Sequence, residues 1–193
     1  MAEEKGFYCI PGYDSEKGNT NSVLYQTFPE KCTSYDPKKD IVAQMKAYEE
    51  SQPKHEVAVV HSFGYHAFVV AWEHGIFDHV KLLIALDGYV SENKAYAQHP
   101  TEVPLIKSIY LFPTDGKRDE YTLEQEIAGE PYVTVVRAVG LRHNLLYRIE
   151  KKIAEDRVEV EEFNVGHAKR LVQRLIAMGG EQRICTRDVD SEE

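Results

Sequence analysis

The chain has 193 residues and a mass of 22.1 kDa; 42% of the residues are hydrophobic and 28% are charged. Acidic residues outnumber basic ones by 32 to 23, which leaves a formal net charge of −9. Because such a charge repels phosphate backbones and no basic stripe interrupts it, we expect no nucleic-acid partner. No apolar run approaches the ~20 residues that cross a bilayer, so we also expect no membrane span.

Three cysteines, Cys9, Cys32 and Cys185, bear on the cellular compartment. Their odd number, wide spacing and lack of a C-x-x-C pair argue against a disulfide framework and against a thiolate zinc site. The polar N-terminus has no hydrophobic region of signal-peptide length. We therefore expect a cytoplasmic protein with reduced thiols, consisting of one domain over residues 1–185 and an acidic, disordered tail over residues 186–193.

The first third of the chain predicts short elements. An apolar run at residues 7–10 predicts a strand, and residues 32–35 predict a second one. Residues 19–28 have a weak helical pattern. A helix is predicted over residues 40–51, where Ile41, Val42, Met45 and Tyr48 share one face.

The most hydrophobic part of the sequence follows. Residues 56–60 predict a β-branched strand, residues 65–72 a buried helix and residues 80–86 an all-apolar strand. Later patterns predict strands at 108–112, 132–139 and 157–163, and helices at 123–128, 145–153 and 168–178. Strands that are apolar on both faces and alternate with helices imply an α/β fold, with a mostly parallel central sheet and helices on both faces.

The turn after the strand at residues 56–60 carries the pentapeptide Val60-His61-Ser62-Phe63-Gly64. It matches the nucleophile elbow G-x-S-x-G except that Val60 stands at the first glycine position. An elbow of this kind exposes the serine hydroxyl above the carboxyl ends of parallel strands, where ligands of such sheets bind. The alternative is an ordinary turn in which Ser62 caps the helix.

A nucleophilic serine needs a histidine base and a carboxylate that orients the base. Both types of residue follow Ser62 in that architecture, in the order Ser, Asp, His. Here one later strand is followed by Asp115 and Asp119, and the next by Gly140-Leu141-Arg142-His143-Asn144. The required residues are therefore present in the required order.

On these residues the sequence resembles the α/β-hydrolase superfamily, and in particular its compact serine esterases without a large cap. The resemblance covers about residues 7–144, with the final helix as a further candidate. The turn Tyr8-Cys9-Ile10-Pro11-Gly12-Tyr13 is similar to the family's His-Gly turn, with Pro11 in place of the histidine. The resemblance implies that the backbone amides of Tyr13 and Phe63 form the oxyanion hole.

The acid and the base each have two candidates. The turn Gly116-Lys117-Arg118-Asp119 is similar to the family's G-x-x-D turn and favours Asp119, although Asp115 lies closer to the strand end. Loop spacing favours His143 as the base, and the alternative is His167 before the last helix. The chain after Asn144 is then an appended strand and helix, the edge of a homodimer, or the final unit of the fold.

The resemblance implies a serine hydrolase that cleaves a small-molecule carboxylic ester or thioester through an acyl-enzyme on Ser62, without a metal or other cofactor. The short segment at residues 89–104 is the candidate lid and predicts an open acyl site. The alternatives are a catalytically inactive hydrolase-fold binding or regulatory protein, which Val60 and Pro11 support, and a lyase or acyltransferase with the same triad.

Four histidines, His61, His66, His74 and His79, invite a metal-site hypothesis. They pair at a spacing of five, whereas metal ligands on a helix are three or four residues apart. We therefore expect no metal there, and we expect His61 to pack and hydrogen bond beside the nucleophile.

Overall fold

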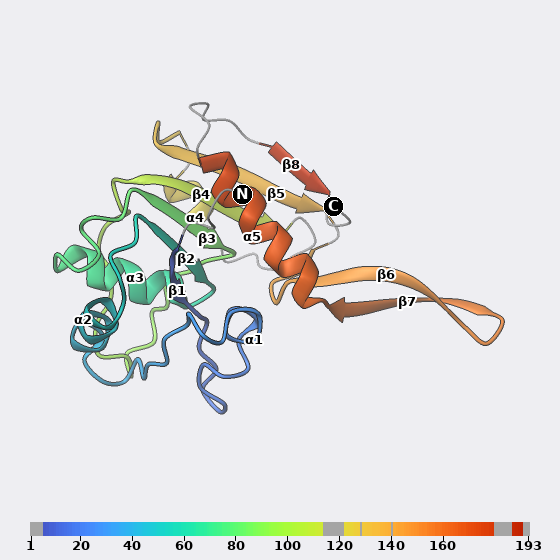
Figure 1. Ribbon diagram of the computed structural model, residues 1–193, viewed down its shortest axis with the longest axis horizontal. Coiled ribbons are helices and arrows are strands. Elements are labelled where there is room, and N and C mark those ends of the chain that lie inside the picture. The colour runs from blue at the N-terminus through green and yellow to red at the C-terminus, as the bar shows by residue number, and fades with distance from the viewer. Residues whose placement is uncertain (1–5, 114–121, 128, 140, 180–186, 191–193) are drawn as a thin grey trace.

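The computed structural model describes residues 6–113, 122–127, 129–139, 141–179 and 187–190. A sheet with the strand order β1-β2-β3-β4-β5-β8 runs through its centre (Figure 1), and each neighbouring pair in it is parallel. Its strands are β1 (Tyr8–Ile10), β2 (Val57–His61), β3 (Leu82–Leu86), β4 (Lys107–Pro113), β5 (Val133–Val139) and β8 (Arg187–Asp190).

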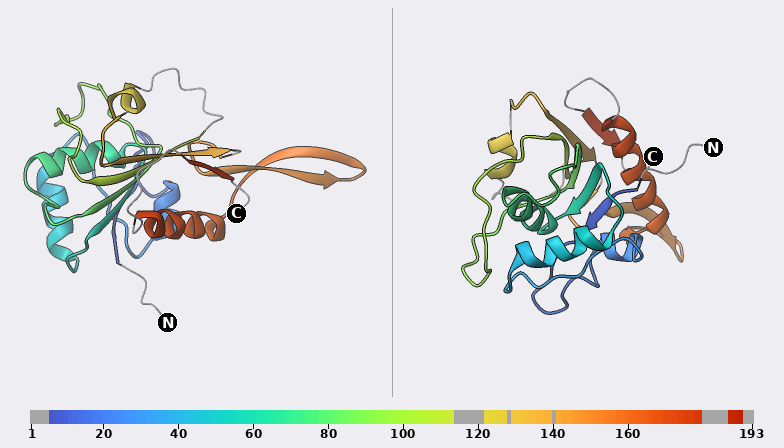
Figure 2. Two further views of the ribbon diagram at one scale, coloured as in Figure 1. Left: turned by 90° about the horizontal axis from the view of Figure 1, so that it is seen from above. Right: turned by 60° about the vertical axis from the view of Figure 1, so that its left-hand side comes forward.

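Helices cover both faces of this sheet (Figure 2), as the sequence predicts. On one face lie α2 (Ile41–Ser51), α3 (Gly64–Glu73) and α4 (Thr122–Ile127). On the other face lie α1 (Val23–Thr27) and α5 (Val165–Gly179). The α/β fold class, with its parallel sheet, is therefore confirmed.

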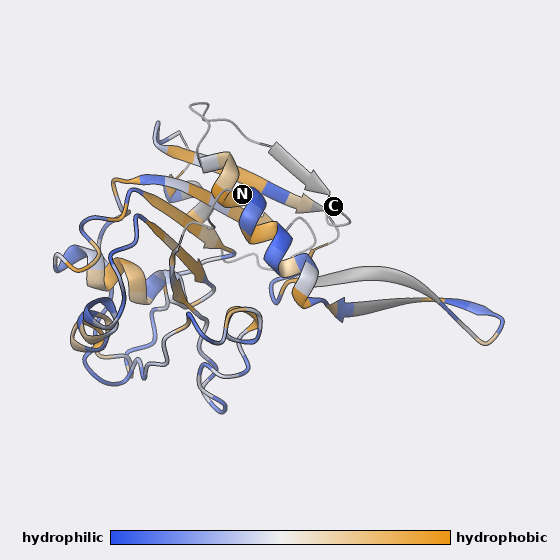
Figure 3. Ribbon diagram, in the orientation of Figure 1, coloured by the Kyte–Doolittle hydropathy of each residue, from blue (hydrophilic) through white to orange (hydrophobic). Residues whose placement is uncertain are grey.

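The central strands explain this layering. All five residues of β2 and all five of β3 are buried, and both strands are hydrophobic (Figure 3) except for His61 at the end of β2. In β2, Ala58 and Val60 pack with α2 and α3, whereas Val57 and Val59 pack with α1 and α5. Because alternate side chains point to opposite faces, a strand that is apolar at every position needs a helix on each side.

The prediction of a helix at residues 145–153 is wrong. This segment forms β6 (Leu146–Ile153), which pairs antiparallel with β7 (Asp156–Phe163) in a hairpin that projects away from the sheet (Figures 1 and 2). Apolar residues four apart fit a helical period of 3.6 and a strand period of two about equally well. Hydrogen bonding to β7 makes this segment a strand. The apolar pattern of residues 146–153 alone does not show that such a partner exists.

Two other segments differ from the expectations. The strand expected at residues 32–35 is reduced to one isolated parallel bridge between Cys9 and Cys32. Within the segment expected to be a disordered tail, Arg187–Asp190 form β8 and pair with β5. In the described part of the chain, no helix is long and apolar enough to cross a membrane.

Candidate active site

Ser62 lies on the turn between β2 and α3, at the carboxyl edge of the sheet. Its φ of 56° is in the left-handed region that non-glycine residues rarely adopt, as expected for a strained elbow. A Cβ on Gly64 would lie 2.2 Å from the carbonyl oxygen of Ile10, so only glycine fits there. Val60, the departure from the motif, is fully buried in the core.

The Ser62 hydroxyl contacts His143, the predicted base. Ser62 Oγ lies 2.9 Å from His143 Nε2. His61 supports this loop, because its Nε2–H donates to the carbonyl oxygen of His143 at 2.7 Å. The packing and hydrogen-bonding role expected of His61 is therefore confirmed. His167, the alternative base, lies in α5, and its backbone N–H donates to Asn164.

Asp87 is the carboxylate that contacts His143. Its Oδ2 accepts from His143 Nδ1–H at 2.5 Å, and its side chain is only 2% exposed. Asp87 also has a positive φ, 42°, and its N–H donates to Leu111 O at 2.7 Å. Asp119 and Asp115, the two acids considered from the sequence, lie outside the described residues.

The topology explains why Asp87 and Ser62 are close. Strands β2 and β3 are parallel neighbours, and their last residues, His61 and Leu86, are paired. Ser62 and Asp87 are the residues that come next on each strand, so they leave the sheet side by side. The sequence does place Asp87 directly after an all-apolar strand, where site residues of parallel sheets lie. Only the pairing of β3 with β2 shows that this aspartate lies next to Ser62.

The loop after β1 approaches the same point. A Cβ on Gly12 would lie 3.2 Å from Ser62 Cβ. The buried side chain of Asn19 donates to the carbonyl oxygen of Gly12 at 3.0 Å and accepts from the N–H of Tyr35 at 2.7 Å. Because this carbonyl and the N–H of Tyr13 belong to one peptide plane, Asn19 fixes the direction of that N–H.

A cleft of about 480 Å³ opens over Ser62 and His143. Its remaining lining mixes aromatic side chains with polar ones and consists of Gly12, Tyr13, Asp14, Lys17, Gly18, Asn21, Ser22, Val23, Gln26, His61, Tyr89, Asn144 and Phe163. Its volume is within the range of small-molecule sites. The cleft therefore suits a small ligand with both apolar and hydrogen-bonding groups.

The segment at residues 89–104, the candidate lid, is tied to the domain by His66 of α3. The N–H of Ser91 donates to His66 Nδ1 at 3.1 Å, and His66 Nε2–H donates to the carbonyl oxygen of Gln98 at 2.8 Å. The ring of His66 stacks on Phe63 with centroids 4.4 Å apart. Burial lowers the pKa of His66 to about 4, so the ring is neutral at pH 7, as both hydrogen bonds require.

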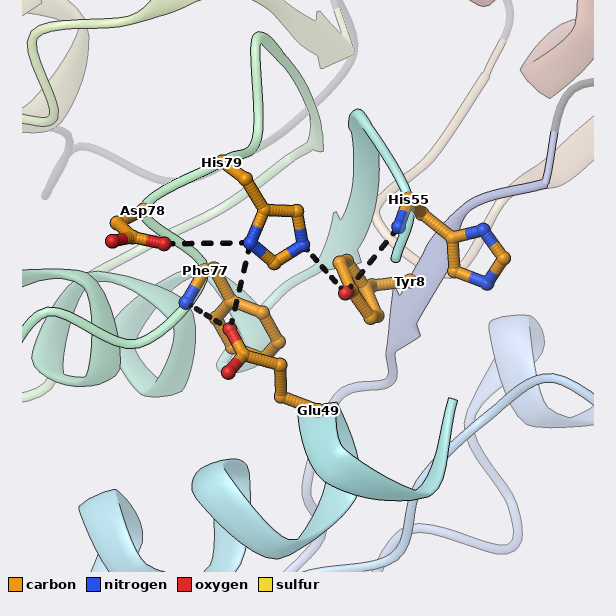
Figure 4. Close-up of polar contacts among 6 residues, drawn as sticks. All are labelled: Tyr8, Glu49, His55, Phe77, Asp78 and His79. Carbon is orange, nitrogen blue, oxygen red and sulfur yellow. Dashed lines mark hydrogen bonds and ion pairs between the residues drawn. The ribbon is translucent and has the colours of Figure 1, made fainter. Parts of the chain in front are cut away.

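A second polar cluster lies at the amino-terminal ends of the strands (Figure 4). The Tyr8 hydroxyl accepts from the N–H of His55 at 3.3 Å and lies 2.7 Å from His79 Nε2, while Glu49 lies 3.9 Å from His79 Nδ1. Burial raises the pKa of Tyr8, which keeps its proton available for the hydrogen bond to His79. The cluster ties β1 to α2 and to the loop before β3, at the opposite edge from Ser62.

Among the described residues, no group of three or more His, Cys, Asp or Glu side chains is arranged to hold a metal ion. Comparison of the chain with protein-family models, with curated proteins and with solved structures finds no match. The arguments about function therefore depend on the geometry of this site.

Proposed function

We propose that this protein is a serine hydrolase of the α/β-hydrolase superfamily that cleaves a carboxylic ester or thioester through an acyl-enzyme on Ser62. One observation carries the proposal, the hydrogen-bonded chain from Ser62 Oγ through His143 to Asp87, which we call the triad. The triad begins on a strained elbow at the carboxyl edge of a parallel sheet. The three residues follow one another along the chain in the order Ser, Asp, His, which is the order in α/β-hydrolases. In this chain the acid, Asp87, directly follows β3.

The geometry supports a complete proton path. Asp87 accepts the Nδ1–H of His143, which leaves Nε2 unprotonated and facing the Ser62 hydroxyl. In the proposed first step, Ser62 Oγ attacks the acyl carbon while Nε2 takes the hydroxyl proton. The imidazolium then gives this proton to the departing alcohol or thiol. A water molecule then attacks the acyl carbon of the acyl-enzyme while His143 Nε2 takes its proton. The imidazolium returns this proton to Ser62 Oγ as the carboxylic acid leaves.

The tetrahedral intermediate carries a negative charge that needs hydrogen-bond donors. We assign this role to the N–H groups of Tyr13 and Phe63, on the two loops that meet at Ser62. Asn19 fixes the Gly12–Tyr13 peptide plane, which carries the N–H of Tyr13, and Phe63 is fixed by its position at the start of α3. One such donor typically contributes ~100- to 1000-fold to the rate.

The contact between Ser62 and His143 favours catalysis over the alternative of an inactive binding protein. In that alternative, nothing would require a hydroxyl and an imidazole nitrogen to lie 2.9 Å apart on a strained turn. The cleft of about 480 Å³ suits a substrate with a small acyl group and a small leaving group.

Covalent labelling with a fluorophosphonate probe, measured by intact mass, tests the proposal. The wild type should take up one probe molecule per chain. Ser62→Ala should take up none, because the nucleophile is missing. His143→Ala should label slowly, whereas His167→Ala is the matched histidine control and should label at the wild-type rate.

Hydrolysis of short-chain p-nitrophenyl esters and of simple acyl thioesters should follow the same order among the variants. A folded wild type that neither labels nor hydrolyses either class of substrate would rule out the proposal and favour the binding protein. Labelling that persists in Ser62→Ala would assign the nucleophile to another residue.

A further inference from the structure

Cys9 of β1 and Cys32, in the turn after α1, lie close enough to react with each other. They are partners in the isolated parallel bridge, and their Sγ atoms are 2.7 Å apart, both as free thiols. A disulfide bond is about 2.05 Å long and joins Cα atoms ~4.4–6.8 Å apart, a range that includes the ~4.8 Å between neighbouring strands. Bond formation therefore requires only a small shift of the two sulfur atoms.

Hydrogen bonds hold the backbone on both sides of this pair. The N–H of Cys9 donates to the Tyr48 hydroxyl at 2.8 Å, and the same hydroxyl donates to the carbonyl oxygen of Lys31 at 2.8 Å. The N–H of Thr33 donates to Cys9 O at 3.3 Å, and the N–H of Cys32 donates to Phe28 O at 3.1 Å. One tyrosine thus links the residue before Cys32 to Cys9, and the register of the two cysteines is maintained without a covalent bond.

We propose that Cys9 and Cys32 form a disulfide when the protein meets a small-molecule disulfide of the glutathione type. This site is independent of the proposed hydrolase function, because neither cysteine belongs to the triad. Both cysteines are free thiols in the structure, as the sequence analysis expects, and the proposal concerns their reaction with an added oxidant.

The two thiols have different roles in the reaction. Cys32 is partly exposed and Cys9 is fully buried, so Cys32 reaches the oxidant first. The Cys32 thiolate attacks one sulfur of the small disulfide, which forms a mixed disulfide and releases one small thiol. Cys9 then loses its proton and attacks Cys32 Sγ, which releases the second small thiol. Two protein thiols are oxidised, and one small disulfide is reduced to two thiols.

Burial makes the second step the slower one. It raises the pKa of the Cys9 thiol, since the thiolate is disfavoured in the apolar core. The short distance between the sulfur atoms offsets this cost, because the reaction within one chain has a high effective concentration.

A Cys9–Cys32 disulfide would close residues 9–32 into a covalent ring, and this ring includes one wall of the cleft. Nine of the fifteen residues that line the cleft, from Gly12 to Gln26, lie between the two cysteines in the sequence. The Gly12–Tyr13 peptide, assigned above to the oxyanion hole, is also in this ring. Oxidation should therefore restrict the motion of the cleft wall and limit the conformations of the unfolded chain.

Intact mass after incubation with oxidised glutathione tests the proposal on the full-length protein. The variant Cys185→Ser keeps only the two proposed partners and should lose about 2 Da, with no thiol left to alkylate after denaturation. In the wild type, peptide mapping should find the same Cys9–Cys32 bond, with Cys185 outside the pair. Cys32→Ser should show no such loss, and Cys9→Ser, if it folds, should retain the glutathione adduct on Cys32.

Two physical measurements accompany the mass. The melting temperature of oxidised Cys185→Ser should rise by about 5–10 °C, reversed by dithiothreitol. Amide hydrogen exchange over residues 10–31 should slow down. If folded Cys185→Ser keeps both thiols or only a stable glutathione adduct, or if peptide mapping of the wild type pairs Cys185 with either partner, the proposal is wrong. Neither measurement uses catalysis, so failure of the hydrolase proposal would leave this test unaffected.

Discussion

At the scale of single residues, the carboxylate of Asp87 determines which nitrogen of His143 faces Ser62. It accepts the Nδ1–H, so Nε2 is left as the acceptor for the serine proton. A neutral amide in its place can donate to Nδ1 and so reverse the tautomer, which puts a proton on Nε2 and removes the proposed base.

We therefore predict that Asp87→Asn lowers kcat for ester hydrolysis by about 10³–10⁴-fold while the protein stays folded. Initial rates with a p-nitrophenyl ester, together with circular dichroism, measure both quantities. Asp115→Asn and Asp119→Asn are the matched controls and should keep activity close to that of the wild type. Full activity in Asp87→Asn, combined with its loss in Asp119→Asn, would return the acid role to the residue preferred from the sequence.

Gly64 shows how tightly the elbow packs against β1. A Cβ at this position would meet the backbone oxygens of Ile10 and Pro11 at 2.2 and 2.9 Å, and backbone cannot move aside as a side chain can. Gly64→Ala should therefore lower the free energy of unfolding by about 3 kcal/mol, or the melting temperature by roughly 10 °C.

Thermal unfolding measures this effect, and Gly179→Ala provides the comparison. The three atoms nearest to a Cβ on Gly179 all belong to the side chain of Leu82, which can change its rotamer. The loss of stability should be clearly smaller in Gly179→Ala. Equal melting temperatures for the two variants would contradict the close approach of β1 to the elbow.

At the scale of elements, His66 connects α3 to the segment at residues 89–104. Both of its ring nitrogens hold backbone groups of that segment, and this arrangement needs the neutral ring. The pKa of His66 is about 4 in the folded protein, against 6.5 as its ordinary value. Protons therefore bind to the unfolded chain before they bind to the folded one as the pH falls.

The sign of the pH dependence follows from this difference. The stabilisation by neutral His66 is fully present above pH 6.5 and is lost as the pH falls from 6.5 towards 4, by about 3 kcal/mol in total. Urea unfolding of the wild type and of His66→Asn at several pH values should show their stability difference shrink over this interval. His167→Asn, a change of a histidine of α5 on the other face of the sheet, should keep the wild-type profile. A difference that stays constant from pH 7 to 4 would contradict a buried, neutral His66.

At the scale of the whole molecule, β8 covers an edge of the sheet. It pairs with β5 from Val136 to Val139, and without it the N–H and C=O groups on that side of β5 are unpaired. Exposed strand edges of this kind promote association between chains.

A chain that ends at residue 186 should therefore melt roughly 5 °C lower and should self-associate as its concentration rises. Light scattering coupled to size-exclusion chromatography measures the association. A chain that ends at Asp190 keeps β8 and is the control. If the shorter chain stays monomeric with an unchanged melting temperature, the β5–β8 pairing has no role in stability.

Much of this fold can be predicted from local patterns. The buried strands β2 and β3 and the helix α3 are mostly apolar, and segments of this kind are stable only in the interior. The segment at residues 146–153 could not be assigned in the same way, because its apolar spacing fits a helix and a strand alike and its partner β7 comes later in the chain.

The same division applies to the candidate site. The sequence by itself indicated Ser62 as the candidate nucleophile, through the elbow pattern, and favoured His143 over His167 as its base, through loop spacing. It did not identify Asp87, because a single aspartate after an apolar strand is common. Only the tertiary structure, by pairing β3 with β2, brings Asp87 to His143. The physical reason is that apolar periodicity is local, whereas the partner of a strand depends on contacts between residues far apart in the chain.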